Sequence, residues 1–232
     1  MQTRLTAILA AFLTAVALLA GCSKSEESTA TDLPDAATLL QQSAETTRGE
    51  SSVHLLLRTT GELEELPIHS LEGDLTNTPA VAAEGKTTVT VMGQKVEDMP
   101  FVVADGDLYA ALFGDAISLI GPAADIYDVG AILDPERGLA NVLSNFSDAK
   151  SVDREKVNDV ETVKITGKVS ADAVNRIAPQ LAVQDAVGGT AWIADGGDHE
   201  LVQVQLEPRD GVTVTMTLSD WGKPVTVTKP AA

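Results

Sequence analysis

The stretch Phe101–Phe113, FVVADGDLYAALF, is the clearest hairpin pattern in the chain. Its two apolar runs are separated by Asp105-Gly106, a pair that favours a tight turn with positive φ. Both runs are apolar on both faces of the expected strands, whereas a sheet with one face in water alternates apolar and polar residues. The hairpin should therefore be covered on two sides, and we expect helices to pack over it.

Alternation of apolar and polar residues predicts further strands on both sides of this hairpin. The apolar positions are Val53, Leu55 and Leu57; Val89 and Val91; Val163 and Ile165; Val202, Val204 and Leu206; Val212, Val214, Met216 and Leu218; and finally Val225 and Val227. A further strand is predicted from Thr190 to Ala194, before a turn at Gly196-Gly197. Because the connections between these runs are short, the sheet should be mostly antiparallel.

Three helical patterns interrupt the strands. The first runs from Asp35 to Arg48, the second begins at Asp134-Pro135, and the third begins after Ser170 and stops before Pro179. Their apolar faces consist of Ala36, Leu39, Leu40 and Ala44; Leu139, Val142, Leu143 and Phe146; and Ala173, Val174 and Ile177. Helices that lie between blocks of strands indicate an α+β fold.

The first 22 residues have the composition of a secretory signal. Arg4 provides a short positive region, and Leu5–Ala20 is almost wholly apolar but too short for a stable membrane-spanning helix. Leu19-Ala20-Gly21-Cys22 resembles the lipobox of bacterial lipoproteins, in which an aliphatic residue and two small residues precede an acylated cysteine. A plain secretory signal with an incidental cysteine is the alternative.

These features predict three segments. Residues 1–21 are the lipoprotein signal peptide, residues 22–31 are the acylated cysteine and a flexible tether, and residues 32–232 are a single domain. We expect the mature protein to lie on the outer face of the cytoplasmic membrane, held there by acyl chains on Cys22.

Composition excludes several classes of function. The formal net charge of −18 repels nucleic acid, so we expect no DNA or RNA partner. Cys22 is the sole cysteine, which leaves the domain without a disulfide, a catalytic thiol or a cysteine metal site. Aromatic residues make up only 3% of the chain, so the interior must be built from aliphatic side chains, which can either fill a core or line a cavity.

Residues with catalytic or metal-binding chemistry are sparse. His54, His69 and His199 lie far apart in the sequence, and Asp195–Glu200 reads as an acidic turn rather than a calcium loop. We expect no cofactor, no metal and no enzymatic activity. A hydrolase that uses Asp105 and Asp107 as paired carboxylates is the enzymatic alternative, although aspartates are common in hairpin turns for conformational reasons.

Residues 120–150, IGPAADIYDVGAILDPERGLANVLSNFSDAK, strongly resemble the mycobacterial LppX/LprAFG lipoprotein family. The resemblance covers essentially all of the mature chain in the same order. It continues through residues 33–36, 73–76, 164–170, 173–179, 197–201, 216–222 and 227–230. The sequence departs from the family in the signal peptide, in residues 62–67 and around residues 180–188.

The resemblance implies both a fold and a function. The fold would be a strongly bent antiparallel half-barrel, with helices covering its concave side and a hydrophobic cavity between the two layers. LprG-like members carry triacylated phosphatidylinositol mannosides, lipoarabinomannan or triacylglycerol, and they act with an export transporter of the major facilitator type. The chain would therefore carry acylated lipids from the cytoplasmic membrane toward the outer envelope.

A cavity for acyl chains needs smooth aliphatic walls with few buried polar groups. If the family geometry holds, the candidates for these walls are Val89, Val91, Leu139, Val142, Leu143 and Phe146. Each could equally be an ordinary core residue. The alternative function is therefore a docking or assembly lipoprotein of the envelope, with a packed core and no lipid cargo.

Overall fold

The computed structural model of the chain describes residues 33–63, 66–112, 114 and 116–231. The predicted signal peptide, Cys22 and the tether lie outside the described residues. None of the helices in the described part has the length and apolar character needed to cross a bilayer.

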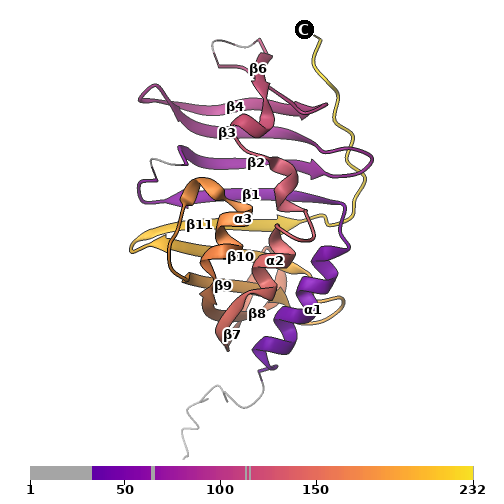
Figure 1. Cartoon of the computed structure of the whole chain (residues 1–232). Helices are drawn as coiled ribbons and strands as arrows, with labels where there is room; N and C mark the ends of the chain where they lie inside the picture. The colour runs from indigo at the N-terminus through magenta and orange to yellow at the C-terminus, as the bar shows by residue number, and fades with distance from the viewer. Residues whose placement is uncertain (1–32, 64–65, 113, 115, 232) are drawn as a thin grey trace, which may run out of the picture. The chain divides into compact units, whose positions relative to one another are not determined.

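The described strands form one eleven-stranded sheet in which every neighbouring pair is antiparallel. The order is β6-β5-β4-β3-β2-β1-β11-β10-β9-β8-β7, so two meanders meet where β1 pairs with β11 (Figure 1). The strands are β1 (Ser52–Thr60), β2 (Ile68–Thr76), β3 (Ala82–Val91), β4 (Gln94–Ala104), β5 (Asp107–Ala110), β6 (Ser118–Pro122), β7 (Phe146–Val157), β8 (Val160–Val169), β9 (Val187–Ala194), β10 (Leu201–Arg209) and β11 (Val212–Ser219). Since β6 and β7 do not pair with each other, the curved sheet stays open.

Helices cover the concave side of the sheet, mainly over its β7–β11 half (Figure 1). They are α1 (Ala36–Arg48), α2 (Leu139–Ser144) and α3 (Ala171–Ile177), with the short 3-10 turns η1 (Ala123–Asp125), η2 (Val129–Ile132) and η3 (Pro179–Leu181). Local capping explains where two of them begin. Asp35 accepts a hydrogen bond from the Thr38 N–H at 2.8 Å, and Ser170 accepts one from the Ala173 N–H at 3.3 Å. The predicted α+β half-barrel with helices on its concave side is confirmed.

The second predicted helix is wrong in both its start and its end. Asp134 accepts hydrogen bonds from the N–H groups of Glu136 and Arg137, but these close only a turn. α2 begins at Leu139, after Gly138, and ends at Ser144. Phe146 is therefore the first residue of β7, because its pairing with Val169 of β8 replaces the helical turn that the spacing predicted.

The predicted hairpin has the expected turn and is covered on both faces over its described residues, 101–112; Phe113 lies outside the described residues. Asp105 and Gly106 have φ values of 54° and 85°. One face contributes to the large apolar core, while Val102, Ala104 and Tyr109 form a second cluster on the opposite face.

A coil segment, not a helix, covers this second face, so the expected helical cover is wrong there. Val227 packs on the cluster, and Lys229 binds Asp105 at 3.0 Å and lies 5.8 Å from the centre of the Tyr109 ring. Val225 and Val227 also do not form a strand: residues 223–231, which we call the C-terminal strap, run along the sheet without joining it (Figure 1). The strap thus covers the second apolar cluster, on the face of the sheet opposite to the large core.

Candidate functional site

An apolar cavity of about 80 Å³ lies between the concave face of the sheet and the segments that cover it. Strands from both meanders contribute to its floor, on either side of the β1–β11 pairing. The lining residues are Leu55, Leu57, Leu66, Ile68, Leu71, Gly73, Asp74, Leu75, Ala83, Phe101, Tyr127, Val129, Ile132, Ile177, Ala178, Leu181, Leu206, Val214 and Met216. Aliphatic side chains therefore dominate the walls.

Two glycines bring β2 and β3 unusually close at the floor of the cavity. Gly73 faces Gly85 across the strand pair, and a Cβ atom added to Gly85 would lie 2.6 Å from the Gly73 Cα and 2.1 Å from the Glu72 carbonyl oxygen. No side chain fits at that separation. Gly73 is itself part of the cavity lining, so backbone rather than a side chain forms the floor at this point.

The cover of the cavity consists of two segments, 126–132 and 177–181, joined by hydrogen bonds. The Tyr127 hydroxyl donates to the Ile177 carbonyl at 2.9 Å, and the Gln180 Nε2 donates to the Ile126 carbonyl at 3.1 Å. Burial raises the pKa of Tyr127 well above its usual value, so this phenol stays protonated and keeps its donor. The two segments therefore hold each other closed over the apolar floor.

The chemistry of the cavity is that of a binding site for apolar groups. Asp74 is the one lining residue with a carboxylate, and that carboxylate is bonded to the His54 Nδ1 at 2.8 Å. Glu72 lies 3.7 Å from the Nε2 atom of the same histidine. Because the Asp74 carboxylate is bound by His54, the cavity offers mainly van der Waals contact and a dry surface.

The size of the cavity has a consequence for binding. A volume of about 80 Å³ is below the roughly 300–1,000 Å³ typical of small-molecule pockets. An acyl chain can enter only if the covering segments move outward. The described conformation is thus a closed one.

The residues that the sequence singled out for the walls lie in three places. Leu139 and Val142 line a small void of about 10 Å³, which shares Ile177, Leu206, Val214 and Met216 with the main cavity. Leu143 and Phe146 line a groove of about 380 Å³ beside α1. Val89 is half-buried and packs on the core, whereas Val91 is half-buried at the end of β3, and neither lines the cavity in this conformation.

Sequence reasoning missed the residues that close the cavity. Tyr127 and Leu181 lie in short 3-10 segments or beside them, where no periodicity marks an inward face. One signal was available: Tyr127 is one of only two tyrosines in a chain poor in aromatic residues, and a buried tyrosine usually has a hydrogen-bond partner.

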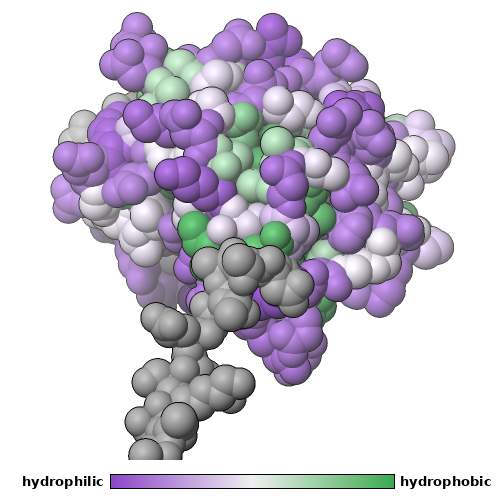
Figure 2. Space-filling view, turned by 90° about the horizontal axis from the view of Figure 1, so that it is seen from below, coloured by the Kyte–Doolittle hydropathy of each residue, from purple (hydrophilic) through white to green (hydrophobic). Residues whose placement is uncertain are grey.

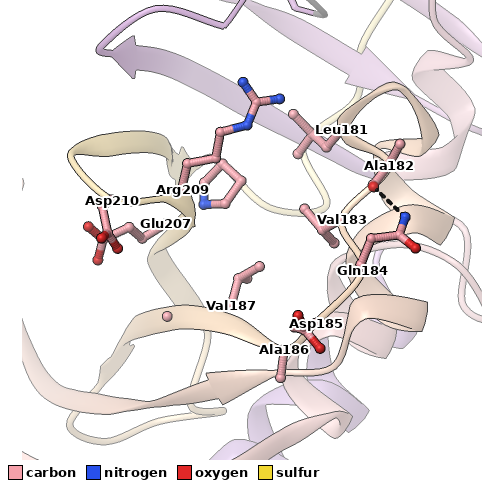
Figure 3. A pocket seen from close by; sticks show the side chains of 12 residues that line it. Leu181, Ala182, Val183, Gln184, Asp185, Ala186, Val187, Glu207, Arg209 and Asp210 are labelled. Carbon is pink, nitrogen blue, oxygen red and sulfur yellow. Dashed lines mark hydrogen bonds between the residues drawn. The ribbon is translucent and has the colours of Figure 1, made fainter.

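A second, more polar pocket of about 440 Å³ adjoins the cavity and shares Leu181 with it. It lies between the 181–188 loop and the end of the β10–β11 hairpin (Figure 3). The Arg209 side chain extends toward Leu181, while Glu207 and Asp210 lie on the other side of the hairpin. An apolar cavity and a polar pocket thus lie next to each other, and Leu181 lines both.

The candidate catalytic groups do not form a site. Asp105 is bound to Lys229 of the strap, and the His199 Nδ1 lies 3.1 Å from the Ala194 carbonyl. Among the described residues, no three His, Cys, Asp or Glu side chains are grouped as a metal site would need.

Comparison with known proteins identifies the family. The model of the LppX_LprAFG lipoprotein family matches residues 35–227. The lipoarabinomannan carrier protein LprG of Mycolicibacterium smegmatis is 57% identical, over 100% of this chain and 100% of that protein. LprG of Mycobacterium leprae is 45% identical, over 98% of this chain and 95% of that protein.

Solved structures agree in fold. Lipoprotein LprF of Mycobacterium bovis superposes with a TM-score of 0.78 at 32% identity, over 86% of this chain and 99% of that one. Lipoprotein LppX of Mycobacterium tuberculosis gives a TM-score of 0.65 at 29% identity, over 83% and 97%. With its sequence matched over nearly the whole domain and its open curved sheet shared with these structures, the chain belongs to the LppX_LprAFG family of lipoproteins.

Proposed function

We propose that this protein is a lipid carrier that encloses the acyl chains of a glycolipid in the cavity between its sheet and its covering segments. The cavity supports this proposal because its walls are aliphatic and lie between the sheet and the segments that cover it. The names of the LprG relatives support lipoarabinomannan as the type of cargo. Triacylated phosphatidylinositol mannosides share both the acyl chains and the sugar headgroup, whereas triacylglycerol shares the acyl chains alone; both belong to the proposal.

The mechanism is physical rather than catalytic. Each methylene group transferred from water to an apolar environment is stabilised by about 0.8 kcal/mol, so a lipid with two or three chains does not cross an aqueous space unaided. A protein that covers the chains removes this barrier, and the sugar headgroup stays in water. The polar pocket beside Leu181 lies where a headgroup can leave the apolar cavity.

The proposed cellular role follows from the N-terminal segment. Acyl chains on Cys22 would hold the carrier on the outer face of the cytoplasmic membrane, where it would receive lipid and pass it toward the outer envelope. An export transporter of the major facilitator type would be its partner in this step.

One observation carries the proposal: an apolar cavity covered by two short segments that hydrogen-bond to each other. The closed volume of about 80 Å³ is also what a docking lipoprotein with a packed core would have, which makes that role the second candidate. The two differ in whether the cover opens for a lipid.

The experiment is native mass spectrometry, with solvent extraction, of the Cys22→Ser protein purified from a mycobacterial host. This variant lacks the anchor but keeps the domain, so any bound lipid is cargo. We expect about one acylated glycolipid per protein. Protein of bare mass that also takes up no added lipid would instead establish the packed, docking role. The same variant purified from a host without such glycolipids, then incubated with phosphatidylinositol mannoside, is the matched control.

A further inference from the structure

We infer that the end of the domain formed by α1 and the β7–β8 hairpin is the surface that rests on the lipid bilayer. This inference rests on the acylated Cys22 of the proposed function. It adds an orientation: the β7 end of the sheet faces the membrane, and the β6 end points away from it. Four independent features of this end support the inference.

The first feature is where the chain enters the domain. The Ser151 hydroxyl on β7 donates to the Pro34 carbonyl at 2.7 Å, so the start of the domain is fixed to β7. Residues 23–32 lie between this point and Cys22. Ten residues span at most about 35 Å when fully extended. An anchor at Cys22 therefore keeps β7 within about 35 Å of the membrane, whereas β6 lies at the opposite end of an eleven-stranded sheet.

The second feature is the distribution of charge. The whole chain has a net charge of −18, but the β7–β8 hairpin, residues 146–169, has five basic and five acidic side chains. At the other end, residues 82–110 of β3–β5 have two basic and five acidic ones. Bilayers with anionic headgroups repel acidic surfaces and attract basic ones. The hairpin, with Lys150 and Lys168 exposed, is thus better suited than the β3–β5 end to lie against such a bilayer.

The third feature is exposed apolar surface on the same hairpin. Val152 and Val160 are 47% and 40% exposed, and both lie on β7–β8. Met92, Leu119, Ile126 and Val81 are also exposed elsewhere among the described residues, and scattered apolar residues are ordinary. Val152 has weight here because it directly follows Ser151, the residue that binds the chain entry.

The fourth feature is a groove of about 380 Å³ between α1, α2 and β7, with Leu40, Ala44, Leu143 and Phe146 among its lining residues. Glu45 and Arg48 lie at its exposed side, so that its floor is apolar and its rim charged. Figure 2 shows this side of the molecule, with apolar residues gathered in a hollow and hydrophilic residues around them. A hollow of this kind can accept the end of one acyl chain from the bilayer.

The test measures which end of the sheet touches lipid. The chain beginning at Cys22 is coupled through its single thiol to a maleimide lipid in vesicles of phosphatidylcholine and phosphatidylglycerol, which reproduces the tether independently of acylation in cells. A reporter is introduced by Val152→Trp or, as the matched control on β6, by Leu119→Trp; Leu119 is 55% exposed. Lipids brominated in their acyl chains quench tryptophan that reaches them. The signal of Trp192 and Trp221 in the parent chain is subtracted.

We expect quenching at least twofold stronger for the Val152→Trp reporter than for the Leu119→Trp reporter. Equal quenching, or stronger quenching at position 119, would overturn the inference. Adding Lys150→Glu and Lys168→Glu should reduce quenching at position 152, whereas Lys86→Glu and Lys95→Glu on β3 and β4 should not. Equal effects of the two pairs would also overturn it. A separate result would contradict the carrier function alone. In that case the Cys22→Ser protein would hold no lipid, while quenching would still be stronger at position 152 than at position 119.

Discussion

At the scale of single residues, the closed cavity depends on a few contacts that hold its cover in place. Tyr127 is the most important of them, because its hydroxyl bridges the two covering segments. The walls themselves are ordinary aliphatic side chains. For the proposed carrier, the contacts that hold the cover and the space beneath it therefore decide whether a lipid can bind.

Tyr127→Phe should make lipid exchange faster. The substitution removes the hydrogen bond to the Ile177 carbonyl, which lowers the free energy of unfolding by about 0.5–1.5 kcal/mol. Because the same bond holds the cover closed, we expect severalfold faster transfer of a fluorescent lipid between protein and vesicles. Tyr109→Phe, on the opposite face of the sheet, is the control and should leave the transfer rate unchanged. Slower transfer in the Tyr127 variant would contradict the role of the cover.

Ala83→Trp should block the cavity from its floor. Ala83 is 5% exposed and lines the cavity, so a large ring there occupies the space that an acyl chain needs. We expect lipid binding to fall at least tenfold, with an overpacking cost of about 1–3 kcal/mol in the free energy of unfolding. Binding is measured by native mass spectrometry and folding by circular dichroism.

Val91→Trp, on the same strand but outside the lining, is the matched control and should bind lipid within twofold of the parent protein. If both substitutions abolish binding while the fold is kept, the cavity that holds the lipid extends along β3 to Val91. It is then longer than the cavity in the closed conformation.

At the scale of elements, the end of α1 meets the β9–β10 turn in a cluster of acidic residues. Burial raises the pKa of Glu50, and the charges of Glu200 and Asp198 raise it further. The folded protein therefore binds this proton more tightly than the unfolded chain does, and its stability falls as pH rises from the usual pKa of a glutamate to the raised value.

Glu50→Gln should remove this pH dependence. The variant should be more stable than the parent protein at pH 7 and equal to it below the usual pKa of glutamate, where both states of the parent are protonated. Urea unfolding at several pH values measures the difference. An equal gain in stability at every pH would mean that the substitution acts through packing rather than through charge.

Removal of the C-terminal strap should expose the second apolar cluster. A chain that ends at Gly222 loses Val227 and the Lys229–Asp105 ion pair, so Val102 and Tyr109 become accessible to water. We expect a loss of about 1–2 kcal/mol in stability, together with stronger binding of an apolar dye and self-association at high concentration. Lys229→Ala alone should destabilise the protein far less than the truncation does, because the pair it breaks is exposed. A truncated protein that stays monomeric and binds no dye would show that the strap is not a cover.

At the scale of the whole molecule, strands with one buried face could be predicted from the sequence, and edge strands could not. In β1, β8, β10 and β11 the apolar residues alternate, because one face meets the core. β7 is an edge strand whose residues are all at least partly exposed, so no pattern marks it. In β2, Gly73 interrupts the alternation, because a residue with a side chain would not fit at the close approach to β3.

The candidate site, too, could be predicted from the sequence only in part. The aliphatic character of the walls could be predicted from composition and from the apolar face of α2. The limits of the cavity could not, since they depend on 3-10 segments that lie across strands far apart in the chain. Leu139 and Val142 border the cavity only through a neighbouring void, while the residues that close it, Tyr127 and Leu181, follow no period.

The pairing of β1 with β11 also sets the order in which the protein can be completed. His54 pairs with Ser219, so nearly the whole chain must be made before β1 gains its second neighbour. Closing so long a loop has an entropic penalty, and contacts of this kind slow folding. Until then the first meander has an open edge at β1 and an uncovered apolar face. A chain emerging from the membrane with its N-terminus first would thus remain prone to aggregation until its last strand arrives, and β11 would act as the closing step of folding.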